Sequence, residues 1–156
     1  MEKTNNKIQQ ILNGNDLKAK KALFSFDQTD SNEAIAFKFN LWSRYFFPQY
    51  FSSKDAPFHK TIDRNNIRAY RGEIKSFTDI AFRGASKTAR TKLFIGFCLC
   101  NDLDHSRGYI KILSSDGTNS TQIVTDLYNI LVNPRVVTLY PEIFEKTNKK
   151  REERMS

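Results

Sequence analysis

The stretch KSFTDIAFRGASKTARTKLFIGFCLC, residues 75–100, decides the predicted fold. Residues 75–82 are rich in Phe, Ile and Thr and predict a short strand. Residues 83–87 predict a polar turn, and residues 88–100 predict a helix whose later turns are apolar on nearly all sides. A helix of that kind belongs in an interior or against a sheet. Its early turns, with Arg90 and Lys92, are expected to be more exposed to solvent.

The same order repeats along the chain. YIKILSS, residues 109–115, predicts a buried strand, and TQIVTDLYNILV, residues 121–132, predicts a helix with one apolar side. Asn133 and Pro134 end that helix. From residue 76 onward the order is therefore strand, turn, helix, strand, turn, helix, which predicts an α/β fold with a parallel sheet.

Helices are predicted before this unit. In residues 29–51, Asp30 is a candidate cap, with Glu33 completing a capping box, and Pro48 ends the helix. One apolar face runs through that helix at spacings of four, three and four residues: Ile35, Phe39, Trp42 and Phe46.

In residues 52–72, Asp55 is a candidate cap, Pro57 suits the first turn and Gly72 follows the end. Residues 5–28 carry two weak helical patterns. The segment RVVTLYPEIF, residues 135–144, is apolar, but its pattern does not indicate one type of secondary structure. Residues 146–156 are charged and predict a frayed helix or a tail.

Composition allows a single folded domain. The 156 residues are 39% hydrophobic and 27% charged, which is ordinary for a globular protein. The 25 Lys and Arg exceed the 17 Asp and Glu, giving a net charge of +8. A basic surface favours polyanions such as nucleic acid or nucleotides. No apolar run approaches the roughly 20 residues that span a bilayer, and no secretory signal is evident.

The two cysteines predict reduced thiols. Cys98 and Cys100 lie two residues apart on a predicted helix, so they point to different faces and cannot pair with each other. Free thiols fit a cytosolic compartment. A zinc site built from Cys98, Cys100 and His105 would need a fourth ligand.

The turn at 83–88 is a candidate phosphate-binding loop. The usual pattern requires glycines at positions 81 and 86, where this chain has Ala81 and Ser86. The context is nevertheless suitable, because a strand, a tight turn with Gly84 and a new helix follow one another. Free N–H groups and the helix dipole favour an anion at such a helix start.

AFRGASKT, residues 81–88, resembles the deviant Walker A loop of the large terminase subunits of tailed bacteriophages, which are ATP-driven DNA-packaging motors. The chain keeps Ala81 and most of the loop that follows, with Phe82 in place of a common Pro. Residues 41–62, with an aromatic helix, a Phe-Pro break and a His, are similar to the family's lead-in. Residues 109–144 are similar to its next unit, and the agreement in order runs from about residue 36 to 145.

The resemblance implies a fold and a site. The fold is an incomplete P-loop NTPase (RecA/ASCE-like) three-layer sandwich with parallel strands, preceded by N-terminal helices. The implied segments are a helical lead-in (1–75), a partial ATPase core (76–145) and a tail (146–156). The implied ligands are ATP and Mg²⁺. The implied cofactor-binding residues are Arg83, Gly84, Ala85, Ser86, Lys87, Thr88 and His59.

Individual roles follow from the same resemblance. Arg83 and Lys87 are the implied catalytic residues, with Arg83 stabilising the γ-phosphate and Lys87 reaching the β- and γ-phosphates. The Thr88 hydroxyl is the implied magnesium ligand. His59 is a candidate for the base side of the nucleotide pocket, with a helix cap or a surface histidine beside Phe58 as the alternative.

One part of the family's pattern is missing. After residue 116 no apolar run ends in Asp-Glu, as a Walker B strand would, and the acidic cluster of the family's nuclease domain is absent too. The resemblance therefore implies an N-terminal part of a terminase large subunit, with weak nucleotide binding and negligible hydrolysis. It also implies double-stranded DNA, a portal protein and a small terminase subunit as partners, ring assembly of the full-length protein, and the host cytoplasm as its location.

A second hypothesis needs no catalysis. Arg83, Lys87, Arg90 and Lys92 carry four positive charges without an intervening acid. On one surface they would hold a phosphate backbone, as in a basic nucleic-acid-binding module.

Overall fold

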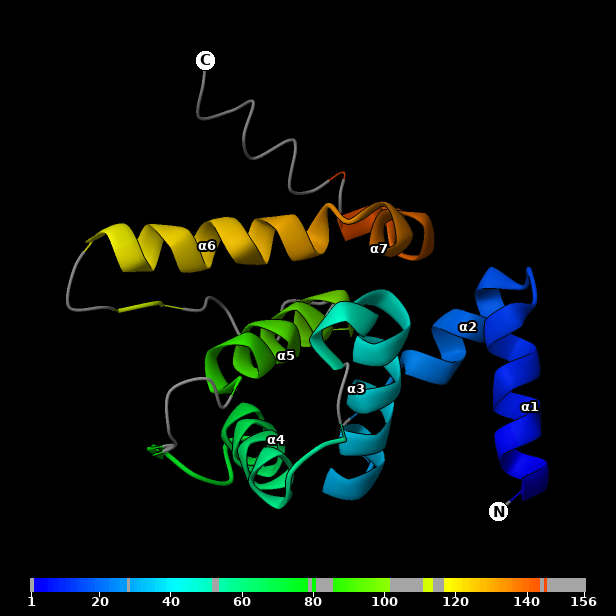
Figure 1. Cartoon of the computed structure of the whole chain (residues 1–156), viewed down its shortest axis with the longest axis horizontal. Coiled ribbons are helices and arrows are strands. Elements are labelled where there is room, and N and C mark those ends of the chain that lie inside the picture. Colours follow the sequence, from blue (N-terminus) through cyan, green and yellow to red (C-terminus); the bar gives the residue numbers. More distant parts are fainter. Residues whose placement is uncertain are drawn as a thin grey trace.

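The computed structural model describes residues 2–27, 29–51, 54–78, 80, 86–101, 111–113, 117–143 and 145. The chain folds into helices joined by short and long connections (Figure 1). These are α1 (Glu2–Asn13), α2 (Leu17–Phe24), α3 (Asn32–Phe46), the 3₁₀ helix η1 (Pro48–Phe51), α4 (Pro57–Tyr70), α5 (Lys87–Asn101), α6 (Gly117–Leu131) and α7 (Pro134–Leu139).

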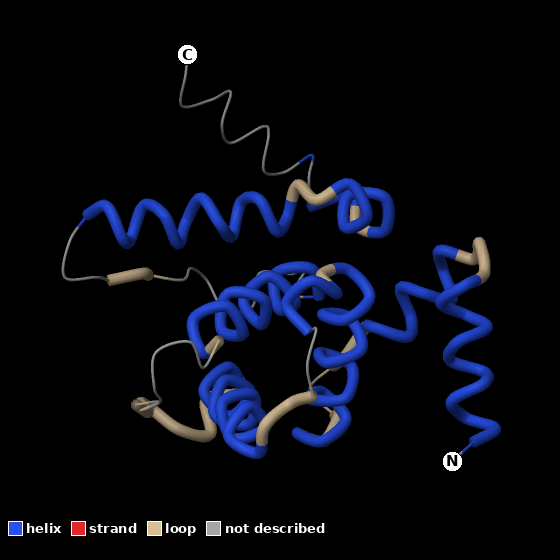
Figure 2. The backbone as a smooth tube through the Cα atoms, viewed as in Figure 1, coloured by secondary structure: helices blue, strands red, loops and turns tan. Residues whose placement is uncertain are grey.

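The predicted α/β fold class is wrong. No strand is assigned anywhere in the described residues, and the backbone drawn in Figure 2 is helix and loop throughout that part of the chain. The described parts of the two predicted strands, residues 75–78, 80 and 111–113, have no regular structure. A three-layer P-loop sandwich with parallel strands is therefore not the architecture of this structure.

The exposure of the predicted strand residues gives the physical reason. Ile80 is 93% exposed and Leu113 is 80% exposed, whereas the sheet required both of them to be covered. A strand is stabilised by ladder hydrogen bonds and by the neighbours on its faces, and two strands alone are marginal in water. An apolar run of strand-like composition therefore does not form a sheet here.

Helix α3 confirms the predicted apolar face, because Ile35, Phe39, Trp42 and Phe46 are all buried. Its predicted cap is displaced by one residue. Ser31 caps the helix and accepts a hydrogen bond from the Ala34 N–H. Asp30 instead accepts from the Lys38 ammonium at 2.8 Å, and no reciprocal contact of Glu33 is recorded among the described residues.

Helix α4 begins with Pro57 at its first position and ends where Gly72 follows, as predicted. Gly72 has φ +75°, a left-handed conformation that a residue without Cβ adopts without strain. The cap position is Ala56 rather than Asp55. Asp55 is therefore available for the ion-pair cluster described below.

A single aromatic-rich core joins the segments before and after residue 75. Rings from α3 and α5 contact one another directly: Phe39 and Phe94 lie edge to face with centroids 5.3 Å apart, and Trp42 and Phe97 lie 5.7 Å apart. The buried cluster contains Phe24, Ile35, Phe39, Trp42, Phe46, Phe47, Ile67, Leu93, Phe94, Phe97, Cys98, Cys100, Leu127, Ile130, Val136, Leu139, Tyr140 and Ile143.

Helix α5 is the central element of that core. It packs against α3, α4 and α6 (Figure 1), which explains why its later turns are apolar on nearly all sides. It approaches α6 closely at Gly96, where a Cβ would lie 2.7 Å from Ile130 Cγ2. The predicted interior helix is thus confirmed, but other helices cover it in place of a sheet.

The ambiguous segment after α6 is helical. Asn133 ends α6 and caps α7 by accepting a hydrogen bond from the Arg135 N–H, and Pro134 occupies the first position of α7. Val136, Leu139 and Tyr140 bury their side chains in the core. Within the described residues, no helix combines the length and the apolar character needed to cross a membrane. The predicted tail, residues 146–156, lies outside the described residues.

Candidate functional site

The candidate phosphate loop ends where α5 begins. Arg83, Gly84 and Ala85 lie outside the described residues. Ser86 precedes the helix with φ +55°, and Lys87 and Thr88 form its first turn. Among the described residues Ser86 alone combines a positive φ with a side chain. Such a conformation is uncommon for a residue with a Cβ and makes an abrupt entry into the helix.

The start of α5 offers backbone donors. The Arg90 N–H makes the first helical hydrogen bond, to the Ser86 carbonyl at 2.9 Å. The N–H groups of Lys87, Thr88 and Ala89 precede that bond and have no acceptor within the helix. Together with the helix dipole, they favour an anion at this end of α5.

Lys87 and Thr88 line a cavity of about 400 Å³. It lies along one side of α5 and is bounded by the segment 111–113 and by Ile123 of α6. The residues lining it are Lys87, Thr88, Thr91, Lys92, Ile95, Lys111, Ile112, Leu113 and Ile123. The structure therefore places two predicted site residues, Lys87 and Thr88, in the lining of one cavity. It adds Lys111, which the loop pattern did not include.

The charges of this cavity suit a polyanion. Lys92 donates to Asp126 at 2.5 Å and is neutralised there. No ion pair of Lys87 or Lys111 is found with another described residue. Two ammonium groups and the hydroxyls of Thr88 and Thr91 thus face one space, which is the set of groups that would hold phosphate oxygens. These cations and hydroxyls fit phosphate oxygens, and the hydroxyls of Thr88 and Thr91 are the only neutral oxygen side chains among the described residues that line the cavity.

A buried ion-pair cluster holds the other side of the first turns of α5. Arg90 donates from Nε and Nη2 to the two carboxylate oxygens of Asp63, at 3.0 and 2.5 Å. Its Nη1 donates to Asp55 Oδ1 at 2.8 Å. The Arg90 side chain is 5% exposed and that of Asp63 is 9% exposed. The prediction that the Arg90 side chain is exposed to solvent is therefore wrong.

Asp55 connects this cluster to α3. Its second oxygen accepts from Arg44 at 3.1 Å and from Asn40 at 3.2 Å. The ring of Phe51 lies within 4.9 Å of the Arg44 guanidinium carbon and within 5.4 Å of that of Arg90. Cation–π contact and paired carboxylates stabilise the buried Arg90 guanidinium away from water, whereas the Arg44 side chain remains 39% exposed.

The two carboxyl groups differ in their pKa because they differ in burial. Desolvation raises the pKa of Asp63 above its ordinary value, and the hydrogen bonds from Arg90 oppose that rise. Desolvation is also felt by Asp55, but the charges of Arg90 and Arg44 outweigh it and lower the pKa of Asp55. Asp55 is therefore the firmly ionised member, and Asp63 depends on Arg90 for its charge.

His59 belongs to this cluster rather than to the cavity of Lys87. Its Nδ1 accepts a hydrogen bond from the Ala56 N–H at 3.1 Å, so Nδ1 carries no proton. The 3.5 Å contact between Nδ1 and Asp55 Oδ1 therefore joins two acceptors and is not an ion pair. The ring also contacts Phe58, with centroids 4.3 Å apart. These contacts match the alternative prediction, a helix cap beside Phe58.

Sequence reasoning missed the Arg90 cluster. Its hydrogen-bonded partners are 27 and 35 residues away along the chain, so no local pattern marked them. Asp55 was assigned to a cap and Arg90 to a solvated turn. The one available signal is the position of Asp63 beside Ile62 on α4, where an acid sits on a buried face and requires a cation.

No metal-binding cluster is found in the described ranges: no three His, Cys, Asp or Glu side chains are grouped as metal ligands there. Cys98 and Cys100 are buried and form no disulfide, and His105 lies outside those ranges. Comparisons of the chain with protein-family models, with curated proteins and with solved structures found no match. The functional argument therefore depends on the start of α5, its cavity and the resemblance of the loop.

Proposed function

We propose that the chain is the N-terminal part of a DNA-packaging ATPase of the terminase large-subunit type, and that it binds the triphosphate of ATP at the start of α5. The observation that carries the proposal is that Lys87 and Thr88 occupy the first turn of a helix and line one cavity with Lys111. The resemblance of residues 81–88 to the deviant Walker A loop supplies the identity of the anion.

Each residue has a defined part in this proposal. The Lys87 ammonium would hold the β- and γ-phosphate oxygens, and the N–H groups at the helix start would hold the remaining charge. The Thr88 hydroxyl would contact the magnesium ion that accompanies ATP. Lys111 adds a second cation to the same cavity. Arg83, by the same resemblance, would stabilise charge that develops on the γ-phosphate.

ATP with its magnesium ion supplies a phosphoanhydride whose cleavage drives movement of DNA in packaging motors. The present chain contributes the phosphate-binding side of such a site. The proposal requires a helix start with cations around it and does not include a parallel sheet.

The wider role follows the same resemblance. In the complete motor the chain would act with double-stranded DNA, a portal protein and a small terminase subunit, in a ring of copies inside the cytoplasm of the infected cell. The high excess of Lys and Arg, a net charge of +8, suits contact with DNA.

The basic nucleic-acid module is less well supported as the main function. It requires Arg83, Lys87, Arg90 and Lys92 to present free charge together. Arg90 is engaged by two carboxylates, and Lys92 is engaged by Asp126. At least two of the four charges are therefore neutralised within the fold.

Titration calorimetry with ATP and magnesium tests the proposal. We expect weak binding by the wild-type chain and no measurable binding by Lys87→Ala, because the substitution removes the cation nearest the helix start. Lys18→Ala is the matched control, since Lys18 is an exposed lysine on α2. It should leave ATP binding unchanged.

Hydrolysis should be negligible in both proteins. Wild-type chain that shows no heat with ATP, or a Lys87→Ala variant that binds like wild type, would overturn the proposal. Binding of ATP that is lost equally in Lys18→Ala would indicate general attraction to positive charge and would overturn it as well.

A further inference from the structure

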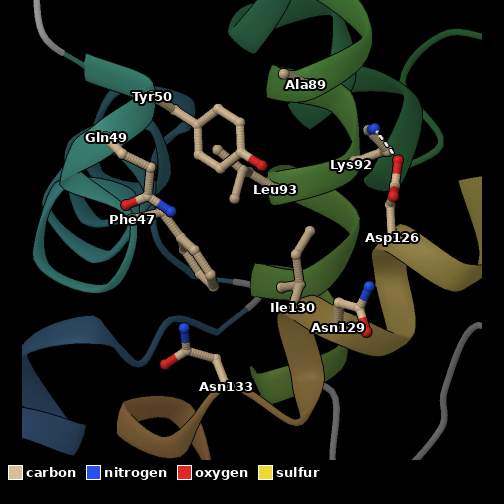
Figure 3. Close-up of a pocket in the computed structure, with 10 residues that line it drawn as sticks. All are labelled: Phe47, Gln49, Tyr50, Ala89, Lys92, Leu93, Asp126, Asn129, Ile130 and Asn133. Carbon is tan, nitrogen blue, oxygen red and sulfur yellow. Dashed lines mark hydrogen bonds and ion pairs between the residues drawn. The ribbon is translucent and has the colours of Figure 1, made fainter.

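A second cavity lies on the neighbouring face of α5, beyond Lys92. It has a volume of about 250 Å³ and is formed by η1, α5, α6 and the residue that caps α7 (Figure 3). Its lining contains Phe47, Gln49, Tyr50, Leu93, Asn129 and Asn133, among others. Lys92 and Asp126, which form an ion pair, both line this cavity, and Lys92 also lines the cavity of Lys87.

The floor of this cavity is apolar and fixed. Phe47 is 4% exposed, Leu93 is 1% exposed and Ile130 is 8% exposed. All three belong to the core cluster, so the floor does not depend on side chains that move freely. A flat apolar group resting on it would be removed from water on one side.

The walls carry carboxamide groups without partners. Among the described residues, the side-chain amides of Gln49 and Asn129 make no hydrogen bond. The Asn133 Oδ1 accepts from the Arg135 N–H, which leaves its NH₂ group free to donate. A primary amide offers both a donor and an acceptor. The walls therefore match a ligand edge that alternates donors and acceptors.

An aromatic ring stands at the mouth. Tyr50 is 55% exposed, unusual for an aromatic side chain that is part of a cavity wall. Its ring centroid lies 6.5 Å from that of the buried Phe47, and its hydroxyl points toward α5 in Figure 3. An exposed ring over an apolar floor is a stacking surface for a planar group.

We infer that this cavity binds an unstacked nucleobase of a single-stranded nucleic acid. A base has a flat face that can stack on the exposed Tyr50 ring. It also has an edge of donors and acceptors that Asn and Gln amides can read. The chain's net charge of +8 attracts the phosphate backbone that would deliver the base. This goes beyond the proposed function, because it uses neither a triphosphate nor the side chains of Lys87 and Thr88.

The test measures binding of a fluorescent eight-nucleotide DNA strand by anisotropy. The matched probe is an abasic strand of equal length, which keeps the backbone charge and removes the bases. We expect the wild-type chain to bind the base-bearing strand about tenfold more tightly, the typical effect of one stacked base. Tyr50→Ala and Asn129→Ala should abolish that difference, and Tyr50→Phe should retain most of it.

Two controls separate this inference from loss of folding and from the phosphate site. Gln10→Ala removes an exposed amide from α1 and should behave as wild type. Far-UV circular dichroism and emission of the buried Trp42 must match wild type in every variant. Lys87→Ala should keep the preference for bases even where it loses ATP.

Competition with free adenosine identifies the source of the base, since adenosine has no phosphate. Displacement of the strand by adenosine would show that the cavity takes free nucleosides too, which supports the inference. No displacement, with the preference for base-bearing strand retained, would restrict it to bases on a strand, which also supports it. Equal affinity for base-bearing and abasic strands, or an unchanged preference in Asn129→Ala, overturns it.

Discussion

Replacement of Arg90 by methionine should strongly destabilise the fold. The substitution keeps an unbranched apolar side chain but removes the guanidinium that donates two hydrogen bonds to Asp63 and one to Asp55. Asp55 still has Arg44 at 3.1 Å. Asp63 loses its ion-pair partner while its side chain remains 9% exposed. It must then either keep a buried charge without compensation or take up a proton, and both destabilise the folded state.

The magnitude follows from that exposure. Removing one partner of a buried ion pair costs about 3–5 kcal/mol, because the remaining charge keeps its desolvation penalty. For a chain of this length, each kcal/mol shifts the melting temperature by roughly 2–4 °C, so the expected decrease is about 6–20 °C. The same change at an exposed site should cost less than about 0.5 kcal/mol.

Trp42 provides the assay. It is the single tryptophan of the chain and is fully buried, so its emission reports exposure of the core during urea or thermal unfolding. Arg64→Met is the matched control, because Arg64 lies on the exposed side of α4, one residue after Asp63. The midpoint of Arg64→Met should remain close to that of wild type.

A double variant tests the physical reason as well as the size of the effect. Arg90→Met combined with Asp63→Leu removes both charges, and an apolar pair of similar volume is often neutral in place of a buried ion pair. The double variant should therefore be more stable than Arg90→Met alone. The reasoning is wrong if Arg90→Met costs no more than Arg64→Met, or if the two substitutions of the pair are simply additive.

Two further predictions concern the contact of α5 with α6. Gly96→Ala should destabilise the fold by about 1–2 kcal/mol, since the clash with Ile130 outweighs the gain in helix propensity. Gly117→Ala, where a Cβ meets nothing within 4 Å, is its control in urea unfolding. Hydrogen bonds from Lys92 and Gln122 lower the pKa of Asp126 in the folded protein. The ionised Asp126 carboxylate therefore stabilises the folded state at pH values above its pKa in the unfolded chain, about 3.9. This contribution is lost as the pH falls through the pKa of Asp126 in the folded state. The free energy of unfolding of wild type should therefore exceed that of Asp126→Asn by up to about 1 kcal/mol at pH 7 and equal it in strong acid. A difference that does not change with pH would contradict this reasoning.

The candidate site was partly predictable. A turn ending at Lys87 and a helix beginning at Thr88 were expected, and α5 begins one residue earlier, at Lys87. The spacing of polar and apolar residues after the turn determines that start. Lys111 was not expected in the same cavity, because nothing in its neighbours indicates where the segment 111–113 lies. The sequence also did not predict that Asp55 pairs with Arg90 and does not cap α4.

The sequence by itself determined where helices form. Apolar residues recur every three or four positions in α3 and α6, and Pro57 and Gly72 bound α4, because helical hydrogen bonds join residues four apart and need no distant partner. The tertiary structure alone decided what those helices contact and whether the described part of the predicted strand, residues 75–78 and 80, would join a sheet. Sheet ladders and buried ion pairs join residues tens of positions apart, so they form only where the packed chain brings both partners together.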